Sequence, residues 1–324
     1  MILLTGATGF LGQHLLQELL TAGYEVRTLV RNEKNRNLPW RKMVDVVEGD
    51  VLDLLALDKA LEGVDTVVHA AAFVSFWKKK KEQVMKVNVE GTANLVNLCL
   101  EKGVGRILHV SSIAAIGRNK KGINTEETPW NREDSVSTYS ISKREAEYEI
   151  YRGIGEGLQA QIINPGLILG PTDNWENGTG QIFSTVYKGL KVYKGGSDGM
   201  VGVKDVARSC SFLLGKDVPN GERYILVGEN WAYHDLLKEI AIALGKNPPS
   251  MKIPAWVANT GGLLNEWLSA MTGKEPGITL EAMRSSNAED SYDGSKITRL
   301  GFEYTPIKDV IKETAEAFLQ KHTS

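Results

Sequence analysis

Tyr139 and Lys143 stand four residues apart in the segment Tyr-Ser-Ile-Ser-Lys. In a helix, this spacing places the two side chains one turn apart on the same face. An ammonium group so close favours the tyrosinate and lowers the phenol pKa from its usual value of about 10. A tyrosine with a lowered pKa is a suitable general acid or base. The pair therefore predicts proton transfer at a substrate oxygen.

Two serines, Ser111 and Ser112, follow directly after a predicted strand at residues 106–110. The carboxyl ends of parallel strands form the edge at which open α/β sheets bind ligands. A serine hydroxyl at that edge can hydrogen-bond a substrate oxygen and orient it toward Tyr139. We expect His109, within the strand, to be a packed residue rather than a catalytic group, and we expect the same of His69 in an earlier strand.

The first twelve residues predict the element that would hold a cofactor beside these groups. Residues 2–4 form a short apolar run, Gly6, Gly9 and Gly12 follow at three-residue spacing, and an amphipathic helical pattern begins at Leu11. Strand, glycine turn and helix are the context of a dinucleotide fingerprint. The glycines permit a tight turn and close approach to a pyrophosphate, and the helix N-terminus adds its positive dipole end. Nucleotide binding is the prediction, and a purely structural turn is the alternative.

The end of the second predicted strand, residues 26–30, indicates which cofactor is bound. An acidic side chain there would bind a ribose 2′-hydroxyl, but the strand ends in valine and Arg31 follows. A guanidinium group binds a 2′-phosphate well. Arg27, Lys34 and Arg36 are expected to add positive charge nearby. We expect NADP(H), with NAD(H) as the alternative if Arg31 is a plain loop residue.

Predicted strands and helices alternate through the first half of the chain. Strands are expected at 2–4, 26–30, 44–48, 66–70, 106–110 and 161–164, and helices at 54–61, 83–102 and 138–151. Asp53 is expected to cap the helix at 54–61. Six strands with crossover helices predict an α/β fold with a Rossmann-type, doubly wound parallel sheet.

The regular pattern breaks after Pro165, where Gly and Pro become dense up to residue 202. Residues 201–214 predict a strand and helix that return to the main sheet, and residues 224–227 predict another strand. Further helices are expected at 232–245, 254–270 and 306–321. We therefore expect a dinucleotide-binding domain of residues 1–165 plus about 201–228. A smaller, interleaved C-terminal substrate domain would comprise about 166–200 and 229–324.

The composition is that of an ordinary globular protein: 324 residues, 42% hydrophobic, 24% charged, net charge −2. This balance gives no reason to expect a nucleic-acid partner, and the lysine run at residues 78–81 is expected to be solvated. No apolar run approaches the ~18 residues of a membrane span, and the fold begins at residue 2, so we expect a cytoplasmic protein without a signal peptide. Cys99 and Cys210 are expected to be buried free thiols, and no metal site is expected.

The chain resembles the extended short-chain dehydrogenases/reductases over nearly its whole length. The matching segments are residues 5–12, 49–51, 69–72, 87–92, 111–112, 139–143 and 164–171. The resemblance implies that Tyr139 is the catalytic acid/base and that Lys143 holds the nicotinamide ribose and tunes Tyr139. Ser112, rather than Ser111, corresponds to the substrate-orienting serine when counted back from Gly117. Asn88 would be structural or part of a proton relay.

The expected cofactor contacts follow the same edge of the sheet. The glycine segment contributes Gly6, Thr8, Gly9, Phe10, Leu11 and Gly12; Arg31, Asp50 and Val51 would lie around the adenosine; Ala70, Ala71 and Ala72 would line the adenine-ribose wall; and Lys143, Pro165 and Ile168 would contact the nicotinamide ribose and ring. The resemblance also implies a homodimer through the helices at 83–102 and 138–151.

Three features resemble the dihydroflavonol-reductase-like and 3β-hydroxysteroid-dehydrogenase-like branch. The pair Val30-Arg31 and the segment 164–166 match it, and the arginine that sugar-nucleotide members often carry is missing from residues 198–206. Ile113 follows Ser112 where a dehydratase needs an acid. We therefore expect reduction of a small organic carbonyl, or oxidation of the alcohol, by hydride transfer. The alternatives are a nucleotide-sugar epimerase/dehydratase with bound NAD and a non-catalytic NADP-binding redox sensor.

Five aromatic residues remain ambiguous at this level, because they suit either an apolar substrate wall or plain core. They are Phe73, Phe76, Trp77, Trp175 and Tyr193.

Overall fold

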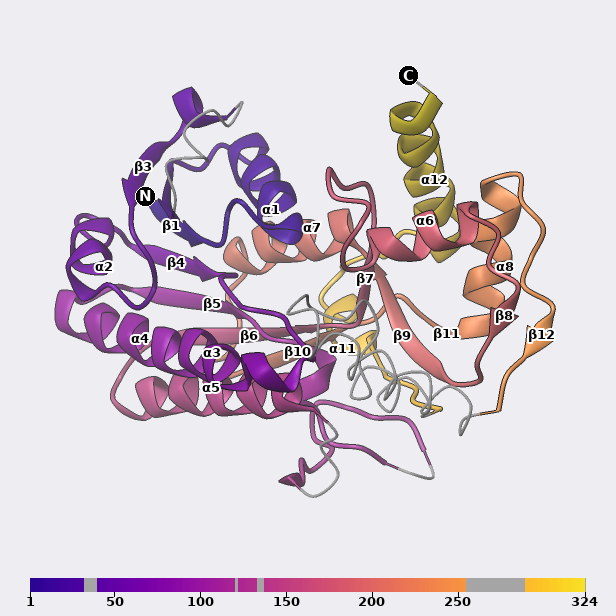
Figure 1. Ribbon diagram of the computed structural model, residues 1–324. Helices are drawn as coiled ribbons and strands as arrows, with labels where there is room; N and C mark the ends of the chain where they lie inside the picture. The colour runs from indigo at the N-terminus through magenta and orange to yellow at the C-terminus, as the bar shows by residue number, and fades with distance from the viewer. Residues whose placement is uncertain (32–39, 120–121, 133–136, 255–288, 324) are drawn as a thin grey trace.

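A seven-stranded, fully parallel sheet forms the centre of the structure, in the order β10-β6-β5-β4-β1-β2-β3 (Figure 1). The computed structural model describes residues 1–31, 40–119, 122–132, 137–254 and 289–323. The strands are β1 (Ile2–Thr5), β2 (Val26–Val30), β3 (Asp45–Glu48), β4 (Thr66–His69), β5 (Arg106–Val110), β6 (Ala160–Pro165) and β10 (Arg223–Leu226). The chain winds from β1 out to β3 and then back to β4 on the other side of β1. This confirms the predicted doubly wound, Rossmann-type sheet, and places a ligand-binding reversal point between β1 and β4.

Burial on both faces explains why these segments form strands. Every residue of β1 and of β6 is buried, as expected of parallel strands covered by helices on either side. The register aligns Thr5 of β1 with His69 of β4, and His69 with His109 of β5. The carboxyl ends of these strands therefore meet at one edge of the sheet.

Two groups of helices cover the sheet. The helices α1 (Phe10–Thr21) and α7 (Val203–Leu214) pack together over one face. The other face is covered by α2 (Leu54–Ala60), α4 (Gly91–Lys102) and α5 (Thr138–Gly155) (Figure 1). Asp53 caps α2 as predicted, because its carboxylate accepts hydrogen bonds from Leu55 N and Ala56 N.

The helix predicted at residues 83–102 is interrupted. It consists of η3 (Lys78–Lys80), α3 (Lys81–Met85), the π-helical turn η4 (Lys86–Glu90) and α4. Asn88 lies in the π-helical turn, where its buried amide accepts from Phe73 N at 2.7 Å and donates to Phe73 O at 3.1 Å. These two bonds accompany the wider turn, a feature that is frequent near functional sites.

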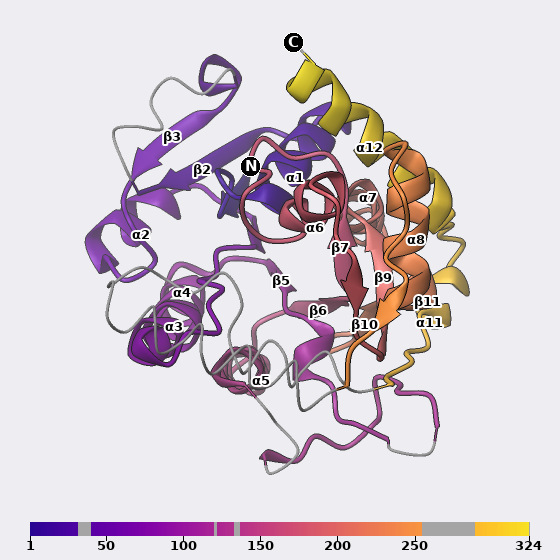
Figure 2. The same ribbon diagram turned by 45° about the vertical axis from the view of Figure 1, so that its right-hand side comes forward.

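The second half of the chain builds two small sheets beside the central one. A three-stranded sheet contains β7 (Leu167–Leu169), β9 (Ser197–Gly202) and β11 (Glu229–Ala232), and β8 (Val192–Tyr193) pairs with β12 (Met251–Lys252). A separate apolar core joins the three-stranded sheet to α6 (Gly180–Tyr187), α8 (Tyr233–Ala243) and α12 (Ile307–Thr323) (Figure 2). The remaining short helices are η2 (Arg41–Met43), η5 (Ile113–Ala115) and α11 (Ser295–Thr298).

We predicted that the strand and helix at residues 201–214 return to the main sheet, and for the strand this prediction is wrong. β9 pairs with β7 and β11 instead, although α7 does pack on α1. Gly166 makes this arrangement fit, because a Cβ atom there would lie 2.3 Å from Gly199 O. The chain can therefore turn away after Pro165 and pair β7 with β9. The strand that returns to the main sheet is β10, which pairs with β6.

Three further predictions concern a membrane span, one helix and the two thiols. No helix in the described part of the chain has the length and apolar character needed to cross a membrane. The helix predicted at 254–270 falls, apart from its first residue, outside the described residues. Cys99 and Cys210 are buried free thiols, as predicted, and burial raises the pKa of each to about 12.

Candidate active site

Ser112 and Tyr139 come together at the end of β5. Ser112 lies two residues beyond that strand, where its hydroxyl oxygen accepts from Ala114 N at 3.2 Å. Tyr139 is the second residue of α5, which Ser137 caps by accepting from Ser140 N at 3.1 Å. The Ser112 hydroxyl hydrogen-bonds the Tyr139 phenol. The structure thus brings the predicted serine and tyrosine into contact.

The prediction that Lys143 lowers the pKa of Tyr139 is wrong for this structure. Burial raises the pKa of Tyr139, and the hydrogen bond from Ser112 opposes that change. Lys143 Nζ instead donates to Val110 O at 2.8 Å. The phenol therefore stays protonated at neutral pH, which suits a proton donor.

Lys143 is itself almost fully buried, with 4% of its surface exposed. Burial lowers the pKa of Lys143 to about 8, and the charge of Glu147 opposes that change. The ammonium therefore remains mostly charged at neutral pH. Burial, together with the charge of Lys143, lowers the pKa of His69 to about 3 and that of His109 well below its usual value. Both histidines are neutral side chains on buried strands.

Three side chains hold the backbone that carries Ser112, and each binds an alternate carbonyl. The donors are Lys143 to Val110 O, Asn164 to Ser112 O and Ser140 to Ala114 O, at 2.8, 2.9 and 2.6 Å respectively. Asn164 also donates to Glu147 Oε1 at 2.6 Å. Sequence reasoning did not name Glu147. Its position four residues after Lys143 could have indicated it, because this spacing puts Glu147 and Lys143 on one face of α5.

The glycine turn fits a bound phosphate group. Gly6 has φ +79°, and a Cβ atom there would lie 2.7 Å from Ala71 N. A Cβ atom on Gly12 would lie 1.9 Å from Gly6 O, so the start of α1 packs directly on the turn. Gly9 precedes α1, and no side chain caps the helix. The first N–H groups of α1 could therefore bind an anion such as the pyrophosphate of a dinucleotide.

The other residues predicted to contact a cofactor lie along the same edge. Thr8, Phe10 and Leu11 form the end of the turn and the start of α1, Val51 follows β3, Ala70, Ala71 and Ala72 follow β4, Pro165 ends β6, and Ile168 lies in β7. Ala71 N donates to Thr5 Oγ1 at 3.1 Å, which holds the segment after β4 beside the glycine turn. The edge is thus continuous from the turn to the end of β6.

Arg31 and Asp50 meet beyond the ends of β2 and β3. Arg31 Nε lies 3.7 Å from Asp50 Oδ2, and 62% of the arginine side chain is exposed. The expectation that Arg27 adds charge at this place is wrong. Arg27 lies near the amino-terminal end of β2, where its Nε donates to Asp45 Oδ2 at 2.6 Å. This place is roughly 13 Å from Arg31 along the strand. Lys34 and Arg36 lie outside the described residues.

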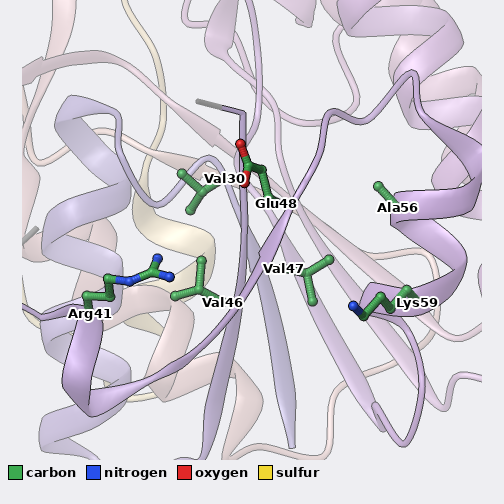
Figure 3. Close-up of a pocket in the computed structure, with 7 residues that line it drawn as sticks. All are labelled: Val30, Arg41, Val46, Val47, Glu48, Ala56 and Lys59. Atoms are coloured by element: carbon green, nitrogen blue, oxygen red, sulfur yellow. The ribbon is translucent and has the colours of Figure 1, made fainter. Parts of the chain in front are cut away.

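A cavity of about 290 Å³ opens along β3, beside the end of β2 (Figure 3). Figure 3 shows Arg41 near Val46 on one side of β3 and Lys59 near Val47 on the other. The full lining is Val30, Arg41, Val46, Val47, Glu48, Ala56 and Lys59. Because Val30 directly precedes Arg31, the cavity adjoins the adenosine end predicted from the sequence, and its lining includes neither Ser112 nor Tyr139.

Asn88 connects two segments of the site. Besides its two bonds to the Phe73 backbone, its amide donates to Ser142 Oγ at 2.9 Å. Ser142 Oγ in turn donates to Tyr139 O at 2.8 Å. Asn88 therefore joins the segment before α3 to the N-terminal part of α5, which fits a structural role.

One of the five ambiguous aromatic residues faces Tyr139. The Phe76 ring meets Tyr139 edge-on, with ring centroids 5.7 Å apart. Trp175 belongs to the apolar core beneath α6 and α12, and Phe73 packs against the core of the main sheet. The Tyr193 ring lies against a histidine ring of α8, tilted by 41° with the ring centroids 4.3 Å apart. The Trp77 ring contacts the ammonium of Lys79, which lies 5.3 Å from the ring centroid. The ring contact with Tyr139 is made by Phe76.

Known proteins resemble this chain over most of its length. The model of the NAD dependent epimerase/dehydratase family matches residues 2–226. A putative dihydroflavonol 4-reductase from Synechocystis is 31% identical, over 98% of this chain and 94% of the relative. The N-acetyl-alpha-D-glucosaminyl-diphospho-ditrans,octacis-undecaprenol 4-epimerase of Escherichia coli O157:H7 is 30% identical, over 93% of this chain and 89% of the relative.

A solved structure agrees with these relatives. The crystal structure of gox2253 matches with a TM-score of 0.84 and 33% identity, covering 99% of this chain and 98% of that chain. Fold, site and sequence therefore agree, and the chain belongs to the NAD-dependent epimerase/dehydratase family of extended short-chain dehydrogenases/reductases.

Proposed function

We propose that this chain is an NADP(H)-dependent oxidoreductase that reduces the carbonyl group of a small organic substrate, or oxidises the corresponding alcohol. The observation that carries the proposal is the buried Tyr139 phenol beside the Ser112 hydroxyl, because burial raises the pKa of the phenol and so keeps its proton available. Two adjacent hydroxyl groups can bind a carbonyl oxygen, and one of them can give it a proton. The similarity to a putative dihydroflavonol 4-reductase supports this reaction class.

The residues divide the chemistry between them. NADPH, held by the glycine turn and Arg31, would supply the hydride for the carbonyl carbon. Ser112 holds the carbonyl oxygen, and Tyr139 gives that oxygen its phenolic proton. The Ser112 hydroxyl stabilises the tyrosinate that remains. The Lys143 ammonium, one turn further along α5, would hold the nicotinamide ribose of the cofactor. Alcohol oxidation needs the tyrosinate at the start, so it is expected to require a higher pH than reduction.

The end of β2 supports NADP(H) over NAD(H). β2 ends in Val30, an apolar residue where an NAD-binding acid would stand, and Arg31 follows. Among the described residues, the ion pair between Arg31 and Asp50 is long and exposed, so it contributes little and occupies few of the guanidinium donors. A 2′-phosphate can therefore be bound there.

Two features on the substrate side support an apolar carbonyl compound over a nucleotide sugar. Phe76 lies against Tyr139. Asp198 of β9 stands in the segment where sugar-nucleotide members often carry an arginine, and its carboxylate accepts from Gly199 N at 2.9 Å and from Tyr233 Oη at 3.1 Å. A carboxyl group at this place offers no positive charge to a diphosphate.

The second candidate is a nucleotide-sugar epimerase or dehydratase with bound NAD. The similarity to a 4-epimerase favours it, whereas Ile113 after Ser112 disfavours the dehydratase reaction. A non-catalytic redox sensor would have no use for the contact between Ser112 and Tyr139.

One purification tests these candidates. The nucleotide retained by the protein is identified by mass spectrometry, and NADPH oxidation is then followed with a panel of aldehydes and ketones. We expect turnover with NADPH and no tightly bound NAD. Retained NAD together with a rise in Tm on adding UDP- or GDP-sugars would overturn the reductase proposal. NADPH binding without any turnover would favour the sensor.

We also propose a homodimer through α4 and α5. The two helices pack side by side, and the outer surface of α5 leaves Tyr148 49% exposed. Tyrosine is enriched in protein interfaces because it combines apolar area with a polar tip. Sedimentation of the wild type and of Tyr148→Glu tests this contact, since a dimer through α5 should dissociate in the variant.

A further inference from the structure

We propose that Glu147 is a positioning residue for the catalytic groups, because its buried carboxylate orients Asn164, which holds Ser112, and places a negative charge one turn from Lys143. The inference rests on the proposed function, and its test includes a measurement that does not need turnover.

The first step is the orientation of Asn164. The Glu147 side chain is fully buried, and Glu147 Oε1 accepts from Asn164 Nδ2 at 2.6 Å. The same nitrogen donates to Ser112 O at 2.9 Å. A carboxylate and a carbonyl can only accept hydrogen bonds, so the amide can face both of them only through its nitrogen. Glu147 thereby selects the orientation in which Asn164 holds Ser112.

The second step is the balance of charge around the carboxylate. Glu147 Oε2 accepts from Arg144 Nη1 at 2.9 Å and from Arg223 Nη1 at 3.1 Å. Arg223 belongs to β10 and also donates to Glu126 O. A buried ionic group needs such partners, and removing one of them leaves the others uncompensated. Glu147 is therefore the centre of a network that joins α5, β6 and β10.

The third step is the set of charges that face Lys143. Its own helix contributes Glu147 and Tyr139, β5 contributes His109, and β4 contributes His69. Both histidines are neutral because burial lowers their pKa, and the phenol is protonated. Glu147 is the negative charge that opposes the effect of burial on Lys143. Without it, the pKa of Lys143 should fall below its present value of about 8.

Glu147→Gln and the matched control Glu126→Gln test the proposal together. Each removes one buried carboxylate, but the Glu126 carboxylate accepts from Ile225 N at 2.9 Å, and Arg223 contacts only the backbone carbonyl of Glu126. We expect both variants to lose stability. Only Glu147→Gln should move the alkaline limb of kcat/KM for carbonyl reduction, by about one pH unit toward lower pH.

The titration of Lys143 in the cofactor-free protein gives a second readout. NMR of lysine labelled at Cε, assigned through Lys143→Arg, should show a lower midpoint in Glu147→Gln than in the wild type and Glu126→Gln. If the proposed reductase function fails, turnover is absent but this titration still responds. An unchanged Lys143 midpoint in Glu147→Gln would overturn the inference.

Two further variants separate the parts of the role. Glu147→Asp keeps the charge but is too short to reach Asn164, so kcat should fall about tenfold while the Lys143 midpoint stays close to that of the wild type. Arg223→Met strengthens the field of Glu147 at Lys143, so the midpoint should rise. This rise of the Lys143 midpoint in Arg223→Met can still be measured if Glu147→Gln does not fold. An unmoved midpoint in Arg223→Met would then contradict the proposal.

Discussion

The catalytic end and the adenosine end of the candidate site are built in opposite ways. At the catalytic end, Lys143 is 4% exposed, and three side chains hold alternate carbonyls of the backbone around Ser112. At the adenosine end, Arg31 is 62% exposed and lies 3.7 Å from Asp50. One end is buried and closely partnered, and the other is open and loosely paired.

This difference follows from what each end is proposed to do. Proton transfer needs donor and acceptor at hydrogen-bond distance, and small displacements are costly. Recognition of a phosphate charge needs only a cation that can reach it, and an exposed cation is screened by salt. Changes at the buried end should therefore be large and insensitive to salt, and changes at the exposed end should be smaller and salt-dependent.

The largest effect is expected for Tyr139→Phe. The variant lacks the phenolic proton but keeps the ring, so kcat should fall about 1,000-fold, within the range of general acid catalysis. Steady-state rates with NADPH measure this loss, while NADPH affinity and Tm serve as controls that should change little. Activity within tenfold of the wild type would remove Tyr139 from the mechanism.

A smaller effect is expected for Arg31→Ala. Loss of a charge-assisted bond to the 2′-phosphate should weaken NADPH binding about 10- to 100-fold and leave NADH binding nearly unchanged. Fluorescence titration measures both constants. Arg27→Ala is the matched control, because Arg27 contacts Asp45 at the far edge of the sheet; it should reduce stability without changing NADPH affinity. Equal losses for the two cofactors would contradict the role of Arg31.

The pH dependence of kcat/KM for reduction should reflect the ionisation of Lys143 at the buried end of the site. The pKa of Lys143 is lowered by burial to about 8, and its charged form is present below that value. The kcat/KM for reduction should therefore be level near pH 7 and fall about tenfold per pH unit well above pH 8. A profile that stays level to pH 10 would show that the charge of Lys143 is not needed.

The smallest effect is expected from a change in ionic strength, which should alter cofactor binding at the adenosine end but not kcat at the catalytic end. Raising the ionic strength from about 0.05 to 0.5 M should weaken NADPH binding several-fold, because Arg31 is exposed. The kcat at saturating cofactor should stay the same, because the catalytic groups are buried. A matching fall in kcat would show that the catalytic end is as open to solvent ions as the other.

Much of the fold was predictable because local patterns carry it. Continuous apolar runs predicted the strands of the main sheet, and the helix at Tyr139 and the cap at Asp53 followed from residue types a few positions apart. The wrong predictions all depended on distant partners. β9 lies outside the main sheet because it pairs with β7. Arg27 binds Asp45 instead of lying near Arg31, and Lys143 binds Val110 O instead of Tyr139.

The sequence by itself determined the glycine turn, the spacing of Tyr139 and Lys143, and the arginine after β2, because these depend on neighbouring residues along one element. The tertiary structure alone decided that Ser112 contacts Tyr139 and that burial raises the pKa of the phenol. It also decided that Glu147 accepts a hydrogen bond from Asn164. These features join β5, β6, β10 and α5. Burial and the choice of hydrogen-bond partner exist only once such separate segments have packed together.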